Sequence, residues 1–117
     1  MKATLLGFGT IEIDGHSYDY DVVIDRGHIR KRDKAASKPF RGPYGHTPLS
    51  LAEKLPWGGE RLIIGTGVDG ALPIQPEVEA EAARRGIALV AVPTKQACRL
   101  VESLEREDVR AVLHVTC

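Results

Sequence analysis

The chain has 117 residues, 43% of them hydrophobic and 27% charged, which suits one folded domain and excludes disordered and fibrous classes. Sixteen basic residues balance sixteen acidic ones, so no overall positive field argues for nucleic acid or an anionic membrane. The apolar runs are too short for a transmembrane helix, and two cysteines do not make a disulfide framework. We therefore expect a single cytoplasmic domain over residues 1–117.

The first third of the chain is typical of antiparallel sheet. Residues 8–13 alternate in polarity and are followed by Asp-Gly at 14–15, a strong hairpin signal. Residues 18–25 form the predicted return strand, and a second turn follows at 26–27. The basic run 28–32 is short and is expected at an edge of the sheet. Together these segments predict a three-stranded meander.

The next segment, residues 33–47, has no hydrophobic periodicity and contains prolines and glycines. This composition predicts an irregular loop, which in a compact domain is often functional. Thr-Pro at 47–48 favours a helix start with Pro48 at the first helical position, so a short helix is expected over residues 48–55.

The second half of the chain alternates strands with helices. Apolar runs at 61–65, 87–92 and 109–115 predict strands, and the helical patterns at 76–85 and 94–106 separate them. The first two of these strands are expected to be parallel and joined by a crossover. The direction of the last strand is left open.

One motif, Gly-x-Gly-x-x-Gly at residues 65–70, follows a predicted strand as in dinucleotide-binding folds. Two prolines, Pro73 and Pro76, delay the helix that should open at the third glycine, and no acid ends the next strand. A glycine-rich turn at the rim of the sheet is therefore favoured, and no cofactor is predicted.

A narrower binding hypothesis uses the same rim. Thr94 is expected to start a helix after the neighbouring strand, where free backbone N–H groups and the helix dipole favour an anion. The alternative is that Thr94 only caps its helix. The candidate ligand-binding residues are Gly65, Thr66, Gly67 and Thr94.

The segment 26–41 holds seven basic residues against one acid, the largest local charge asymmetry in the chain. It can contact an acidic protein partner, or, with Phe40 and Tyr44 nearby, a single-stranded nucleic acid; plain solvated surface is the third reading. The candidate partner-contact residues are Arg32, Lys34, Lys38 and Arg41.

Cysteine and histidine residues give no strong metal or nucleophile pattern. The spacing of His46, Cys98, His114 and Cys117 matches none of the strong zinc motifs. Cys98 beside Val101 is more typical of a small core residue than of a nucleophile paired with a histidine. No catalytic residue and no metal ligand are predicted.

Taken in order, several segments resemble one small family, the domain of unknown function family four-nine-eight, also called Mth nine-three-eight-like. The most specific pair is Ile-Ile-Gly-Thr-Gly at 63–67 followed by Thr-x-x-Ala at 94–97. Further matching segments are Phe8–Ile11, Asp21–Ile24, Gly86–Ile87 and Val109–His114.

The resemblance implies a three-layer α/β fold around a mixed central sheet, with the N-terminal antiparallel meander packed against it. It implies no enzyme activity. The family includes the adipogenesis-associated domain protein and a mitochondrial assembly factor of respiratory complex I. Relatives of that factor commonly carry Tyr-Asn where this chain has Leu100-Val101.

Two functions remain: a non-catalytic interaction or assembly protein, or a binder of a small ligand or anion with at most a minor enzyme activity. Oligomeric state is not predicted.

Overall fold

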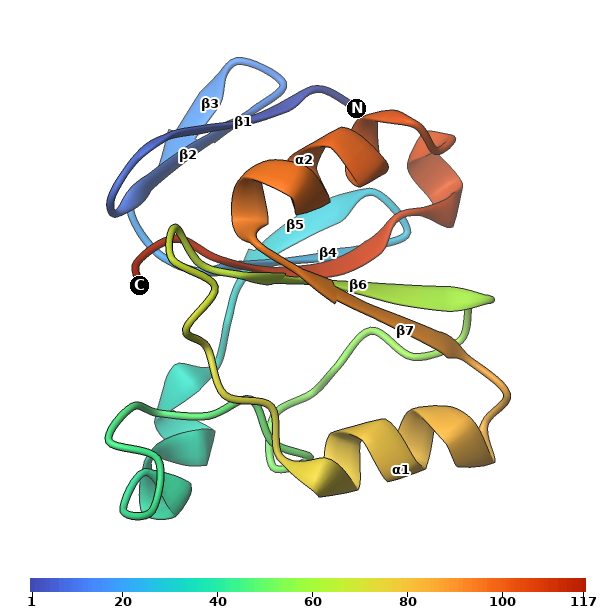
Figure 1. Cartoon of the computed structure of the whole chain (residues 1–117). Helices are drawn as coiled ribbons and strands as arrows, with labels where there is room; N and C mark the ends of the chain where they lie inside the picture. Colours follow the sequence, from blue (N-terminus) through green and yellow to red (C-terminus); the bar gives the residue numbers. More distant parts are fainter.

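A five-stranded mixed sheet forms the middle layer of the computed structural model, which describes residues 1–117 (Figure 1). Its strands lie in the order β5-β4-β8-β6-β7. Their bounds are β4 (Val22–Asp25), β5 (His28–Lys31), β6 (Arg61–Thr66), β7 (Ala88–Val92) and β8 (Arg110–His114). Strand β8 pairs antiparallel with β4 and parallel with β6, so the last strand of the chain occupies the centre of the sheet.

Two outer layers cover this sheet (Figure 1). One holds helix α2 (Thr94–Glu102) and a separate antiparallel sheet of β1 (Ala3–Gly7), β2 (Thr10–Ile13) and β3 (His16–Tyr18). The other holds helix α1 (Pro76–Arg84) and a 3-10 helix, η1 (Lys34–Phe40). A second 3-10 helix, η2 (Arg106–Asp108), precedes β8. The mixed α/β architecture is the one expected from the sequence.

Alternation along the central strands divides the core into two clusters. Val112 of β8 lies between Val23 of β4 and Ile64 of β6, and all three pack in the cluster that includes the buried face of α1. The next residue, Ala111, points to the opposite face and joins the cluster that includes α2 and the three-stranded sheet. This is the period of two that a strand buried on both faces requires.

Several expected elements are present. The turns at 14–15 and 26–27 each place two successive residues at positive φ, as tight hairpins do. Strand β5 is an edge strand, and β6 pairs in parallel with β7. Neither α-helix is long or apolar enough to cross a bilayer, since each has nine residues.

The N-terminal meander is composed of other strands than the sequence predicts. The expected return strand over 18–25 is two strands, β3 and β4, that belong to different sheets, and residues 3–7, for which the sequence predicts no strand, pair with β2. The chain leaves the small sheet at residues 19–21, where Asp21 is buried and its carboxylate accepts the Val115 amide of the segment after β8. The alternating pattern of residues 18–25 looks like one strand, but the hydrogen bond between Asp21 and distant Val115 lies at the point where the chain passes from one sheet to the other.

The helix predicted over 48–55 is absent. The Leu49 N–H donates to the carbonyl oxygen of Pro73, and the Leu49 carbonyl oxygen accepts the Gln75 N–H, so this backbone pairs across rather than along the chain. The preceding loop, in turn, is more regular than expected, because η1 occupies part of 33–47 and buries Ser37 completely. Helix α2 also ends earlier than predicted, at Glu102, which leaves Leu104 partly exposed.

Candidate functional site

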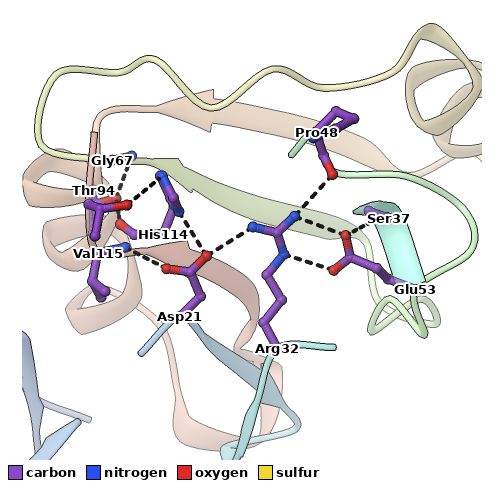
Figure 2. Close-up of polar contacts among 10 residues, drawn as sticks. Asp21, Arg32, Ser37, Pro48, Glu53, Gly67, Thr94, His114 and Val115 are labelled. Atoms are coloured by element: carbon purple, nitrogen blue, oxygen red, sulfur yellow. Dashed lines mark hydrogen bonds and ion pairs between the residues drawn. The ribbon is translucent and has the colours of Figure 1, made fainter. Parts of the chain in front are cut away.

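A network of buried charged side chains lies at one end of the central sheet (Figure 2). Arg32, which directly follows β5, lies between two carboxylates: its Nη1 is 2.9 Å from Oδ2 of Asp21, and its Nε is 2.8 Å from Oε1 of Glu53. The three residues are 3%, 8% and 5% exposed, so all are withdrawn from water. Burial of a charge is tolerated only when it is paired and hydrogen-bonded, as each one is here.

Neutral groups complete the coordination of Arg32 and Glu53. The third guanidinium nitrogen, Nη2, donates to Oε2 of Glu53 at 2.9 Å and to the Pro48 carbonyl oxygen at 3.0 Å. The Ser37 hydroxyl donates to the same Oε2 atom at 2.5 Å and lies 2.6 Å from the Ser50 hydroxyl. Since Ser37 belongs to η1, these bonds anchor the basic segment to the body of the protein.

The charges of this network stabilise one another. Burial alone would raise the pKa of Asp21, but the hydrogen bond and charge of His114, the Val115 amide and the Arg32 charge together hold that pKa below its ordinary value. Burial likewise opposes the charge on Arg32, yet hydrogen bonds and charges of Glu53 and Asp21 raise the pKa of the guanidinium. Asp21 is therefore an ionised acceptor at neutral pH.

The network continues through His114, the last residue of β8. Its Nδ1 lies 2.7 Å from Oδ2 of Asp21, and its Nε2 lies 3.2 Å from Oγ1 of Thr116. The Val115 N–H donates to the other oxygen of Asp21 at 2.8 Å, so both carboxylate oxygens are engaged. An imidazole ring held by a carboxylate on one nitrogen presents the other nitrogen in a fixed direction.

A cavity of about 170 Å³ opens beside His114 and Thr116. Its walls come from the basic segment and residues 46–47, from the loop after β6, and from the last residue of β8 and the segment that follows it. The lining residues are Lys34, Arg41, His46, Thr47, Ala71, Leu72, His114, Thr116 and Cys117. No aspartate or glutamate side chain lines it, so the charged and titratable nitrogen groups at its wall favour a negatively charged occupant.

The four predicted ligand-binding residues do lie together, but they form packed structure. Thr94 is completely buried, and its hydroxyl donates to the His114 carbonyl oxygen at 2.6 Å and accepts the Gly67 N–H at 2.8 Å. It is the first residue of α2 and makes no capping bond to that helix, so its predicted role as helix cap is wrong. None of Gly65, Thr66, Gly67 or Thr94 lines the cavity. Anion binding by them stays a prediction.

Two glycines in this rim are required by close packing. A Cβ on Gly65 would lie 2.8 Å from the Thr94 hydroxyl oxygen, and a Cβ on Gly67 would lie 2.4 Å from the backbone of Cys117. Gly67 also has φ of +107°, a conformation that side chains disfavour. Gly67 thus lets residues 116–117 lie against the loop after β6 and form one wall of the cavity, whereas Gly65 makes room for Thr94.

The predicted partner-contact residues separate into three environments. Arg32 cannot contact a partner in the folded protein, because it is buried in the ion-pair network. Lys34 and Arg41 are exposed and line the cavity, whereas Lys38 is exposed outside it. The local charge seen in the sequence is therefore divided between the interior, the cavity and the outer surface.

The cysteine and histidine residues considered for zinc also separate. His46, His114 and Cys117 line the cavity, but Cys98 is buried in the cluster beneath α2. Burial, reinforced by the charge of Glu102, raises the pKa of the Cys98 thiol to about 11, so this thiol is a core group. No group of three or more potential ligands gathers for a metal ion.

Sequence reasoning missed Asp21, Glu53 and Thr116 as site residues and considered His114 only for zinc. A signal was present, because Asp21 adjoins the apolar run Val22–Ile24 and His114 lies between Leu113 and Val115. Charged or polar side chains within apolar strands must find buried partners. The sequence does not identify those partners, because Asp21 and His114 lie 93 positions apart and meet only in the folded chain.

Comparison with known proteins agrees with this architecture. A family model described as "Protein of unknown function (DUF498/DUF598)" matches residues 3–114. The conserved hypothetical protein PH1505 from Pyrococcus horikoshii OT3 is 32% identical, with a TM-score of 0.83 and complete coverage of both chains. The structure named MT938 is 27% identical with a TM-score of 0.67, covering 99% of this chain and 98% of that one.

A third similar structure, a protein from Bordetella pertussis, is described as a Mth938-like domain. It is 20% identical with a TM-score of 0.59, covers 97% of this chain and 85% of that one, and supports the fold alone. The family match spans nearly all the residues that build both sheets, both helices and the buried ion-pair network. The chain is therefore a member of the DUF498/DUF598 family and has the Mth938-like α/β fold.

Proposed function

We propose that the chain binds a small anionic ligand, a carboxylate or a phosphate, in the basic cavity. The observation that carries this proposal is the lining itself: Lys34 and Arg41 provide cationic groups, His114 provides a fixed imidazole, and no acidic side chain opposes them. The hydroxyl group of Thr47 adds a neutral hydrogen-bond donor at the same wall. Charge-assisted hydrogen bonds to an oxyanion are roughly twice as strong as neutral ones.

The size of the cavity limits the ligand. At about 170 Å³ it is smaller than the pockets of drug-sized ligands, which begin at roughly 300 Å³. The occupant is thus a small acid or phosphate, or only the anionic end of a longer molecule. One part of the cavity wall is held in place, because Lys34 is the first residue of η1 and the Ser37 hydroxyl ties that 3-10 helix to the buried Glu53 carboxylate.

A titration with inorganic phosphate and with succinate at low salt tests the proposal. We expect amide NMR shifts at Lys34, Thr47, Leu72 and Thr116. The double variant Lys34→Gln/Arg41→Gln is expected to weaken binding at least about tenfold, since hydrogen bonds to charged groups contribute about 1.5–3 kcal/mol. Added salt should weaken binding in the native protein as well.

A matched control separates the cavity from general surface charge. Lys38→Gln/Arg99→Gln removes the same number of positive charges from exposed positions outside the cavity and should leave the affinity unchanged. Equal losses in both double variants, or shifts confined to Lys38 and its neighbours, would contradict the proposal. Shifts confined to Gly65 and Gly67 would instead locate the anion at the rim predicted from the sequence.

An interaction or assembly role is the second function, and it rests on Lys38 and the exposed parts of the basic segment rather than on Arg32. Lys38 projects from η1 and is not committed to the buried network. In a pull-down, Lys38→Ser should then lose a salt-sensitive partner that Arg99→Ser retains. A partner retained equally by both variants would leave this segment as solvated surface.

A further inference from the structure

A continuous hydrogen-bonded row of carboxylate, imidazole and hydroxyl runs from buried Asp21 to the wall of the basic cavity, which His114 and Thr116 line. Oδ2 of Asp21 lies 2.7 Å from Nδ1 of His114, and Nε2 of His114 lies 3.2 Å from Oγ1 of Thr116. We infer that this row makes the Thr116 hydroxyl a nucleophile toward small esters that carry a carboxylate, an inference that rests on the anion-binding function proposed above. The reaction class is hydrolysis through an acyl-threonine intermediate.

The partners of Asp21 set the direction of the hydrogen bonds. Its Oδ1 accepts the Val115 N–H, and its Oδ2 accepts both Nη1 of Arg32 and Nδ1–H of His114. An ionised carboxylate only accepts, so whenever the imidazole is in its neutral form its hydrogen lies on Nδ1 and Nε2 is an acceptor. The Thr116 hydroxyl then donates to Nε2, which is the arrangement a general base requires.

The three groups differ in exposure in the way the reaction needs. Asp21 and His114 are only 8% and 5% exposed. Asp21 is a positioning residue, because its carboxylate holds the imidazole of His114 in place through the hydrogen bond to Nδ1. Thr116 is half-buried, and its backbone is fixed because its carbonyl oxygen accepts the Val68 N–H at 2.7 Å. His114 and Thr116 both line the cavity, so an ester that enters it lies next to these two residues.

The basic lining determines which esters are favoured. Lys34 and Arg41 line the same cavity as Thr116, so they can hold a carboxylate on the acyl part of the substrate. Holding that group keeps the ester carbonyl near the nucleophile, which converts a bimolecular encounter into a positioned reaction. A neutral ester of the same length lacks this attachment and should react more slowly.

The chemistry balances with water as the only co-reactant. Thr116 Oγ1 attacks the ester carbonyl carbon, and its proton passes to Nε2 of His114 as the new C–O bond forms. The tetrahedral intermediate collapses, the bond to the leaving alcohol breaks, and His114 returns the proton to that oxygen. Water then attacks the acyl-threonine through the same proton transfers, which releases the acid and regenerates Thr116.

The mono-para-nitrophenyl ester of succinic acid tests the inference, with release of para-nitrophenolate as the readout. Thr116→Val keeps the shape of the side chain and removes the hydroxyl; we expect it to lower kcat/KM by roughly a hundredfold or more. Thr116→Ser retains a hydroxyl and should keep much of the activity. The control Thr4→Val, on an exposed position of β1, should match the native protein.

Mass spectrometry of the quenched reaction locates the acyl group and does not depend on a folded variant. A succinyl adduct on the peptide that contains Thr116 supports the inference. Adducts only on lysines or on Cys117 would overturn it, as would a Thr116→Val protein as active as the native one. Activity lost in Cys117→Ser but kept in Thr116→Val would assign the nucleophile to the thiol instead, which also overturns the inference.

Two outcomes separate this inference from the proposed function. If free succinate binds the cavity but no acyl-Thr116 forms, the hydroxyl is not a nucleophile and the binding function stands. If succinate neither binds nor inhibits, while the succinyl ester and para-nitrophenyl acetate are hydrolysed equally through Thr116, the anion site fails and the proton relay stands.

Discussion

The imidazole of His114 and the carboxylate of Asp21 meet at 2.7 Å although they lie 93 positions apart in the chain. His114 ends the central strand β8, and Asp21 lies where the chain passes from the small sheet to the large one. Their contact therefore fixes the end of β8 relative to both sheets. It also places a buried anion next to the only imidazole that this network contains.

Asp21→Asn should lower the free energy of unfolding by about 3 kcal/mol near neutral pH, because a buried ion pair loses one partner. Folding lowers the pKa of Asp21, so its contribution is present above the unfolded pKa of about 4 and is lost as the pH falls toward the folded pKa. The difference between variant and native protein should thus shrink in acid. Urea unfolding across the acid range measures it.

Exposed Asp19, two positions away, provides the control. Asp19→Asn should change the free energy of unfolding by no more than about 0.5 kcal/mol at any pH in the series. A gap between the Asp21→Asn and native proteins that stays constant, or widens, as the pH falls would show that the carboxylate charge is not what stabilises this junction.

Arg32→Met should destabilise the protein by about 3–5 kcal/mol, because it leaves Asp21 and Glu53 buried without their shared cation. The exposed Arg99 of α2 allows a matched comparison, and Arg99→Met should have little effect. Thermal unfolding of the two variants measures the difference. Similar melting temperatures would mean that the buried pairs contribute no more than surface charge.

Leu113→Ala should lower the free energy of unfolding by about 2–5 kcal/mol, since Leu113 is completely buried in the central strand. Leu104→Ala should cost less than half as much, because α2 ends before Leu104 and leaves it partly exposed. Chemical denaturation gives both values. Equal costs would place Leu104 inside the core, as the helical pattern of the sequence predicts.

Gly67→Ala should be clearly more destabilising than Gly86→Ala, by at least about 1 kcal/mol. Both glycines have positive φ, but an added Cβ at Gly67 would overlap the backbone of Cys117, whereas nothing lies within 4 Å of one at Gly86. The Gly67 variant should also shift the amide resonance of Thr116, because residues 116–117 must move. Equal melting temperatures would show that this wall of the cavity yields easily.

The local elements of the second half were predictable because their signals are local. The apolar runs of β6 and β8 and the charge order of α1, with acids in its first turn and Arg84 in its last, are each complete within a few residues. The two hairpin turns were predictable for the same reason, since each contains a glycine, Gly15 or Gly27, that adopts positive φ without a steric penalty. The ordered series of these segments was also enough to indicate the family.

Sheet membership and the site were decided only when distant segments packed together. Residues 18–25 alternate as one strand would, but Asp21 finds its partners in Arg32, His114 and Val115, and the chain bends there to reach them. Threonine is a residue type that commonly caps helices, yet the Thr94 hydroxyl instead bonds to the Gly67 N–H and to the carbonyl oxygen of His114 at the end of β8. A buried polar group takes whichever partner the fold brings within hydrogen-bond distance, and that distance is a property of the packed structure and not of neighbouring residues in the chain.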